Sequence, residues 1–179
     1  MEATKNLNTT GRMIIVLFLV GALTALALGF INYITVDRIA ELKAERTADA
    51  MREVLDASAY TELEYTGSDS LVATIYEAEG AGYVVEVLPS GFGGVIDMMV
   101  GIDQSGTVTG VSIIEMSETS GLGANASKEE FRAQFVGESG SVAVTKDGGT
   151  IDALTGATIT SRAVSNGVNA ALDAVAALG

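Results

Sequence analysis

The chain has 179 residues, a formal net charge of −13, and neither histidine nor cysteine. Without imidazole or thiolate groups it has no usual ligand for zinc, haem iron or an iron–sulfur cluster, so we predict no metal site and no catalytic residue. So acidic a surface repels phosphate backbones, which argues against nucleic acid as a partner. Any redox chemistry must therefore come from an organic cofactor held by hydroxyls, backbone amides and carboxylates.

The first long feature is an uncharged run between Arg12 and Asp37. About 20 apolar residues are needed to cross the hydrocarbon core as a helix, and residues 13–35 meet that length. Tyr33 lies where an interfacial aromatic anchor is expected. We therefore predict a short tail over residues 1–12 and a transmembrane helix over residues 13–35.

The alternative for this run is a cleavable signal peptide, because Ala25-Leu26-Ala27 resembles a cleavage site. The apolar run continues past that point through Leu28, Phe30 and Ile31, which favours an uncleaved anchor. Basic residues stand on both sides of the run, so the positive-inside rule alone leaves its orientation open.

Residues 36–58 keep a helical rhythm of apolar side chains interrupted by charges, and residues 66–70 carry a turn signal. We predict a helical stalk and linker over residues 36–70, followed by a globular domain over residues 71–179. In that domain the apolar pattern changes to period two, which is typical of strands. The predicted strands are residues 71–78, 83–88, 95–102, 107–115 and 141–145. The first four form one antiparallel sheet, so the predicted fold class is α+β.

Two helices are predicted to pack on this sheet. A short helix should begin at Ser127, since Ser127 and Glu130 have the spacing of a capping box. Phe131 and Phe135, at positions i and i+4, would fix that helix to the sheet. Lys128 could reach a phosphate from there, although a solvated surface lysine is the simpler interpretation.

The last helix should begin near Thr160 and carries an apolar stripe at helical spacing. The stripe consists of Val164, Val168, Ala171, Leu172 and Val175. The helix N-terminus directs unpaired N–H groups and partial positive charge toward residues 152–158, where a phosphate would be stabilised. The alternative is that Thr158, Thr160 and Ser161 are simply N-cap candidates.

The segment Asp152-x-x-Thr155-Gly156-Ala157-Thr158 resembles the motif recognised by flavin transferases. Three further strings occur in the expected order: Gly91-Phe92-Gly93-Gly94, Met99-Val100-Gly101-Ile102-Asp103 and Glu118-Thr119-Ser120-Gly121-Leu122-Gly123. Together they resemble the FMN-binding domain of the G subunit of Rnf ferredoxin:NAD oxidoreductases, over about residues 71–178. The C subunit of sodium-translocating NADH:quinone reductase is the near relative and the alternative assignment.

This resemblance implies a covalent FMN joined through its phosphate to the Thr158 hydroxyl. It assigns the phosphate and ribityl chain to Thr155, Gly156, Ala157 and Ser161. The isoalloxazine ring is assigned to Thr119, Leu122 and Gly123, with Glu118 in the same loop. Asp152 belongs to the transferase recognition motif together with Thr155, Gly156, Ala157 and Thr158. Ser120 stands where the family commonly has proline, which would stiffen that loop.

The resemblance also implies a function, partners and a location. The chain would be an electron-transfer subunit of the multisubunit Rnf ion translocase, with no complete reaction of its own. It would be matured by a flavin transferase and anchored in the bilayer of the inner membrane. Its N-terminus would be cytoplasmic and its FMN domain on the outer face. Two other classes remain open from the residues: a membrane-tethered binding module without cofactor, and a structural assembly subunit.

Overall fold

The computed structural model describes residues 2–65 and 67–178, and the chain divides into two compact units, Met1–Ala44 and Glu45–Gly179. Helix α1, Glu2–Val54, contains the first unit and ends in the second. Between Met13 and Val36 its large apolar side chains are 51% to 77% exposed. Among the described residues, one helical segment, Thr10–Val54, is long and apolar enough to cross a membrane, a test that a signal sequence also passes.

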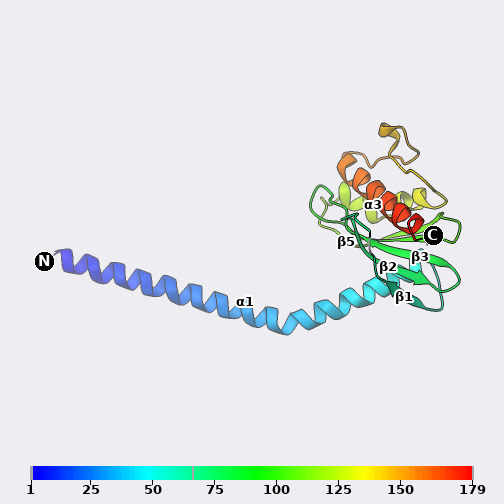
Figure 1. Ribbon diagram of the computed structural model, residues 1–179. Helices are drawn as coiled ribbons and strands as arrows, with labels where there is room; N and C mark the ends of the chain where they lie inside the picture. The colour runs from blue at the N-terminus through cyan, green and yellow to red at the C-terminus, as the bar shows by residue number, and fades with distance from the viewer. Residues whose placement is uncertain (1, 66, 179) are drawn as a thin grey trace. The chain divides into compact units, whose positions relative to one another are not determined.

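The second unit is built on a five-stranded antiparallel sheet with the strand order β1-β2-β3-β4-β5 (Figure 1). The strands are β1 Tyr60–Leu63, β2 Val72–Ala78, β3 Gly82–Val87, β4 Asp97–Asp103 and β5 Val108–Glu115. The four predicted sheet strands are confirmed as β2 to β5. Strand β1 was not predicted; it lies in the segment assigned to the stalk and linker, yet it pairs with β2 from Tyr60 opposite Ala78 to Leu63 opposite Ile75.

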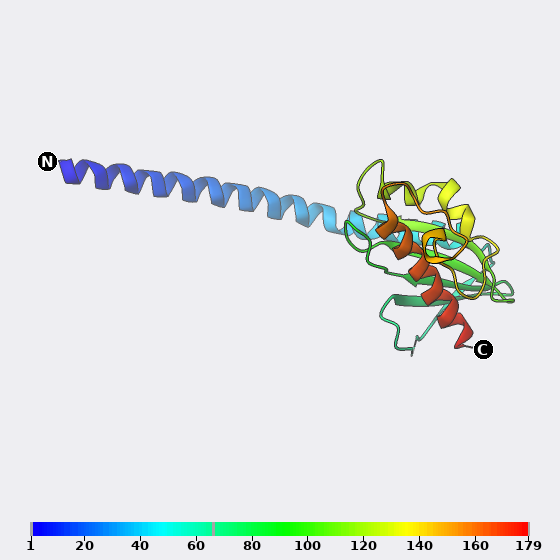
Figure 2. The same ribbon diagram turned by 90° about the horizontal axis from the view of Figure 1, so that it is seen from above.

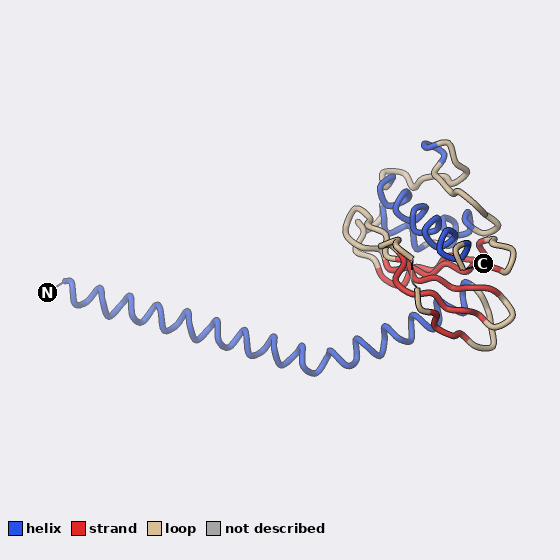
Figure 3. Tube along the Cα trace, in the orientation of Figure 1, coloured by secondary structure: helices blue, strands red, loops and turns tan. Residues whose placement is uncertain are grey.

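The two faces of the sheet are covered by different helices, because successive strand residues point to opposite sides. Helix α3, Thr158–Ala176, packs with Val85 and Met98 on one face, and Figure 2 shows it crossing the strands. The last turns of α1 pack Met51 and Val54 with Val84 on the other. The predicted α+β class is therefore confirmed, with helices on both sides of the red strands in Figure 3.

The end of α1 fits closely against two glycines that are paired across the sheet, Gly101 of β4 and Gly110 of β5. A Cβ on Gly110 would lie 2.9 Å from the Cα of Val54, and one on Gly101 would overlap the Val54 carbonyl oxygen. The Thr109 hydroxyl donates to that carbonyl at 2.6 Å. The absence of side chains at these two positions is therefore what admits α1 to the sheet surface.

The connection between β5 and α3 is irregular. It contains four short helical turns: η1 Gly123–Ser127, α2 Glu129–Arg132, η2 Ala133–Phe135 and η3 Thr145–Asp147. Phe131 and Phe135 are buried, as predicted, and their rings meet edge to face at a centroid distance of 5.5 Å. These two rings fix the connection to the main core.

Two predictions in this connection are wrong. Helix α2 begins at Glu129, because Ser127 belongs to η1 and its hydroxyl donates to the Ala124 carbonyl instead of capping α2. The predicted strand over residues 141–145 is reduced to one parallel bridge between Val144 and Ile151. Its backbone is held by a side chain, since the Asn169 amide accepts from the Val142 N–H and donates to the Val142 carbonyl.

Candidate functional site

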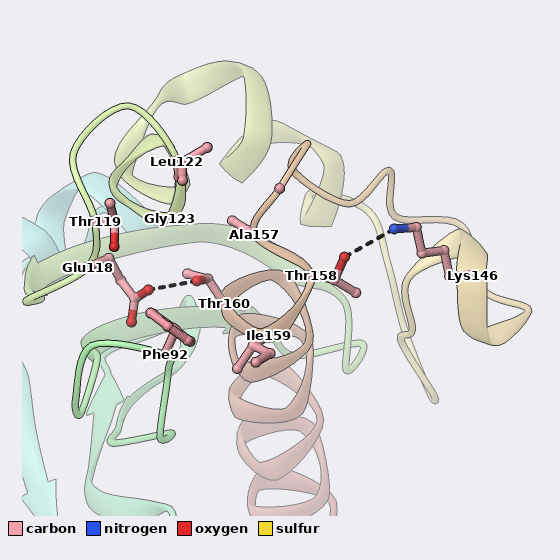
Figure 4. Close-up of a pocket in the computed structure, with 11 residues that line it drawn as sticks. Phe92, Glu118, Thr119, Leu122, Gly123, Lys146, Ala157, Thr158, Ile159 and Thr160 are labelled. Atoms are coloured by element: carbon pink, nitrogen blue, oxygen red, sulfur yellow. Dashed lines mark hydrogen bonds between the residues drawn. The ribbon is translucent and has the colours of Figure 1, made fainter.

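A pocket of about 420 Å³ lies at the N-terminus of α3, within the size range of small-molecule sites (Figure 4). It is lined by residues from four separate segments of the chain. These are Phe92; Glu118, Thr119, Leu122 and Gly123; Lys146; and Gly156, Ala157, Thr158, Ile159 and Thr160. The structure thus brings together six residues predicted for the cofactor, Glu118, Thr119, Leu122, Gly123, Gly156 and Ala157, with the predicted attachment residue Thr158.

A tight turn places Thr158 at the first position of α3. The Ala157 N–H donates to the Leu154 carbonyl at 3.0 Å, and Gly156 has φ +75°. This is the third position of a turn that requires positive φ, which explains glycine in the motif. The predicted start near Thr160 is thus two residues late, and the N-cap is Ala157, which leaves the neighbouring hydroxyls free for other contacts.

The buried Ser161 hydroxyl fastens that turn to the helix. It donates to the Ala157 carbonyl at 3.0 Å and accepts from the Leu154 N–H at 2.9 Å. Ser161 lies beneath the turn and does not line the pocket. Its contacts are therefore with the backbone that carries Thr158.

The half-buried Thr158 side chain meets a lysine from a distant loop. The Lys146 ammonium donates to the Thr158 Oγ1 at 3.0 Å. The first hydrogen bond of α3 runs from Ser161 to Ala157, so the amides of residues 158–160 have no acceptor within the helix. Lysine charge, helix amides and a hydroxyl consequently meet at one end of the pocket, an arrangement suited to an anionic group.

An ion pair holds the loop that carries Lys146. The Arg162 guanidinium donates to both carboxylate oxygens of Asp147, at 2.7 Å each. These hydrogen bonds are the main reason that the pKa of Asp147 lies below its ordinary value, with added attraction from the charges of Arg162 and Lys146. The η3 turn is thereby attached to the first turns of α3.

At the other end of the pocket, Glu118 connects three segments. One carboxylate oxygen accepts from the Gly93 N–H at 2.9 Å, and the other accepts from the Thr160 hydroxyl at 2.7 Å. Gly123 lies so close that a Cβ there would be 2.5 Å from the carboxylate. The Glu118 carboxylate thus links the loop of Gly93 and its own loop to the first turn of α3.

Three large apolar side chains line the pocket while still exposed. Phe92 is 69% exposed, Ile159 53% and Leu122 43%. In Figure 4, Phe92 lies near Ile159 at the side away from Lys146. The pocket therefore has a cationic end at Lys146 and, toward Phe92, exposed apolar side chains beside the hydrogen-bonded Glu118 carboxylate. This arrangement suits a ligand with an anionic group and a flat apolar part.

The other predicted residues lie outside this pocket. Asp152 and Thr155 are exposed and line a separate hollow, together with Lys128. The Asp152 N–H donates to the Gln134 side-chain oxygen at 2.7 Å. Lys128 is therefore placed away from Thr158, and Asp152 and Thr155 present their side chains on a different surface from the Thr158 hydroxyl.

Sequence reasoning did not assign four pocket residues: Phe92, Lys146, Ile159 and Thr160. Phe92 lay inside a quoted family motif, and Thr160 was considered only as an N-cap. Lys146 lies outside the resembling motifs, and its contact with Thr158 depends on the Asp147–Arg162 pair. The one sequence signal for Lys146 was its position as a basic residue in the turn that precedes the motif of residues 152–158.

Comparison with known proteins defines the class first. Residues 91–173 match the model of the FMN-binding domain family. A crystal structure of the C subunit of the Na⁺-translocating NADH-quinone reductase of Parabacteroides distasonis has the same fold. Its TM-score is 0.58 at 21% identity, over 78% of this chain and 93% of that chain. Residues 91–173, within the second unit, form an FMN-binding domain.

Curated relatives then define the family. The chain is 35% identical to the G subunit of the Na⁺-translocating ferredoxin:NAD⁺ oxidoreductase complex of Acetobacterium woodii, over 87% of this chain and 86% of the relative. It is 34% identical to the G subunit of the ion-translocating oxidoreductase complex of Methanosarcina acetivorans, over 93% and 94%. It is 36% identical to the G subunit of the proton-translocating ferredoxin:NAD⁺ oxidoreductase complex of Clostridium ljungdahlii, over 96% and 89%. The chain belongs to the family of G subunits of ion-translocating oxidoreductase complexes.

Proposed function

We propose that this chain is a membrane-anchored electron-transfer subunit of an ion-translocating ferredoxin:NAD⁺ oxidoreductase complex, and that it carries FMN joined through the phosphate to Thr158. The observation that carries the proposal is the Thr158 hydroxyl at the cationic end of a pocket in an FMN-binding domain. Identities of 34% to 36% to three G subunits, against 21% to a quinone reductase C subunit, favour the former complex.

The pocket residues fit FMN by their chemistry. An FMN phosphate needs cationic and N–H donors, which Lys146 and the first amides of α3 supply. A flat ring needs apolar surface and close backbone approach, which Phe92, Leu122 and Gly123 supply. When bound, FMN supplies the capacity to accept and release electrons.

The chain's own residues bind and orient. Gly156 and Ser161 shape the turn that presents Thr158, and Glu118 holds the opposite loop in place. We assign Thr119, Leu122 and Gly123 to the ring side, and Gly156, Ala157 and Thr158 to the phosphate side. Thr155 and Ser161 contribute indirectly, through the turn and its attachment to α3.

Attachment requires an enzyme, because a threonine hydroxyl is a weak nucleophile until an adjacent general base removes its proton. We propose a flavin transferase and a donor with an activated phosphate, such as a flavin dinucleotide. The Thr158 Oγ1–P bond forms, the pyrophosphate P–O bond breaks, a nucleoside monophosphate leaves, and the hydroxyl proton passes to the transferase. Asp152 and Thr155, exposed outside the pocket, are available for its recognition.

The membrane assignment rests on the exposed apolar side chains of α1 and on the ion-translocating complexes named for the relatives. We propose a cytoplasmic tail over residues 1–12, an inner-membrane span over residues 13–35, and the FMN domain within residues 71–179 on the outer face. The native chain has no cysteine, so a membrane-impermeant maleimide can test this directly. Ser139→Cys should react in intact cells and Thr10→Cys only after lysis; the reverse pattern refutes the orientation.

The functional test is a denaturing gel of the full chain produced with a flavin transferase and viewed under ultraviolet light. The natural chain and Thr158→Ser should fluoresce, and Thr158→Val should not. Thr61→Val, an exposed change on the edge strand β1, is the matched control and should fluoresce. A colourless natural chain would instead support a binding module without cofactor, and fluorescence of Thr158→Val would place the attachment elsewhere.

A further inference from the structure

We propose that Lys146 is the phosphate-binding cation of this site and that Arg162 keeps it available by occupying Asp147. This inference rests on the proposed function. Its first observation is direct: Lys146 Nζ lies 3.0 Å from Thr158 Oγ1, the atom that would carry the phosphorus. Figure 4 shows the two side chains directed toward each other at one end of the pocket.

Lys146 can interact with Thr158 both as a free hydroxyl and as a phosphodiester. Before attachment its ammonium donates to Oγ1, which fixes one lone pair and leaves the hydroxyl hydrogen directed elsewhere for removal. After attachment the same atom is an ester oxygen, and the adjacent phosphodiester carries one negative charge. A lysine at this distance reaches the phosphate oxygens and compensates that charge without moving its backbone.

The neighbouring charges decide whether Lys146 stays on Thr158. Asp147 is the next residue and a competing anion, and the charge of Lys146 contributes to the lowered pKa of its carboxyl group. Arg162, from α3, donates to both of its carboxylate oxygens. Because both oxygens are already paired with a guanidinium, the ammonium of Lys146 remains directed to Thr158.

The arrangement also explains the position of the loop. The η3 turn ends at Gly148, whose φ is +88°, so the chain reverses there with little strain. The Asp147–Arg162 pair attaches this reversing turn to α3 four residues beyond Thr158. A lysine on an exposed turn is thereby placed above the first residue of the helix.

The experiment measures the rate of flavin attachment to the purified full chain in detergent, with a purified flavin transferase and its flavin dinucleotide donor. In-gel fluorescence gives the rate, and peptide mass spectrometry gives the modified fraction. Lys146→Met should slow attachment about 10- to 100-fold, the range for loss of one hydrogen bond to a charged group. Lys146→Arg should restore the rate to within a few-fold of the natural chain.

The matched control is Lys43→Met, which removes an exposed lysine of α1 that lines neither the pocket nor the hollow with Asp152 and Thr155. It should attach flavin at the natural rate, with unfolding midpoints compared for all variants. Lys146→Met at the natural rate, or Lys146→Arg as slow as Lys146→Met with natural unfolding midpoints, overturns the role of Lys146. A natural chain that accepts no flavin instead overturns the proposed function.

Two more variants test the role of Arg162. Arg162→Gln frees Asp147 to capture Lys146 and should slow attachment several-fold. Adding Asp147→Asn removes the competing carboxylate and should recover most of the rate. If the double variant is no faster than Arg162→Gln, the pair does not act by freeing Lys146.

A spectroscopic readout on the loaded protein is independent of the attachment rate. The ³¹P resonance of the phosphodiester should move in Lys146→Met toward the position found for a denatured, flavin-bearing chain. Lys43→Met should leave the resonance unchanged. A resonance that is identical in the natural chain and in Lys146→Met contradicts a contact between Lys146 and the phosphate.

Discussion

The two faces of the sheet use helices in opposite ways. On one face, the last turns of α1 are pressed onto Gly101 and Gly110 without space for a Cβ. On the other, α3 packs its stripe on the core but leaves its N-terminus open at a pocket. Close packing on one face fixes the end of α1 on the sheet. On the other face, the open N-terminus of α3 provides the groups that can bind a ligand.

The largest expected effect on stability comes from adding a methyl group where α1 contacts the two glycines. Gly101→Ala places a methyl group against the Val54 carbonyl oxygen, and backbone on both sides has to move. We expect a loss of about 3 kcal/mol in the free energy of unfolding, measured by urea titration of tyrosine fluorescence in detergent. Gly29→Ala in α1, where nothing lies within 4 Å, is the control and should be unchanged or slightly stabilised.

This change also tests whether the two faces are separable. At a temperature where Gly101→Ala is folded, Thr158 should still accept flavin at the natural rate. A folded Gly101→Ala chain that no longer accepts flavin would show that the α1 face contributes to the pocket.

A smaller effect is expected on the pocket face at Glu118. Glu118→Ala leaves the Gly93 N–H and the Thr160 hydroxyl without their acceptor and should cost about 2 kcal/mol. Glu118→Gln can accept from Gly93 with its oxygen and donate to the Thr160 oxygen, so it should cost less than half as much. Urea midpoints of the two variants provide the comparison, and equal losses of stability would contradict a role for the Glu118 hydrogen bonds in linking the loops to α3.

The smallest effect concerns pH and the α1 face. Burial raises the pKa of Glu53, but hydrogen bonds from Ser112 and Arg132 and the charge of Arg132 outweigh it, so the folded-state pKa lies below 4.5. A lowered folded pKa adds stability above the unfolded value, and that stability is lost as pH falls through the folded one. Because half of the Glu53 side chain is exposed, the contribution is well below about 1 kcal/mol.

Glu53→Gln should therefore unfold with a weaker pH dependence below about pH 4.5 than the natural chain. The difference between the two urea midpoints should be largest near neutral pH and shrink toward pH 3. A difference that grows as the pH falls would contradict the assigned direction.

Much of the fold could be predicted because it depends on local patterns. Period-two alternation predicted β2 to β5. An uncharged apolar run and the helical spacing after it predicted α1, and helical spacing predicted the stripe of α3 from Val164 to Leu172. The four-residue strand β1 was missed because an edge strand so short has little pattern of its own. The capping box at Ser127 failed because its hydroxyl is used inside η1.

The site divides in the same way. The turn around Gly156 and the hydroxyl of Thr158 belong to one contiguous motif, so the sequence alone could suggest them. Lys146 could not be assigned, because its contact with Thr158 spans twelve residues and depends on a pair between Asp147 and Arg162. Side chains positioned by tertiary contacts carry no periodic signal.

The most direct test of the central claim is peptide mass spectrometry of the full chain produced with a flavin transferase. The peptide containing Thr158 should be heavier by one FMN less one water, and fragmentation should place the added phosphate on that side chain. An unmodified Thr158 peptide in a chain that still carries flavin, or flavin released on denaturation, would contradict covalent attachment at this residue.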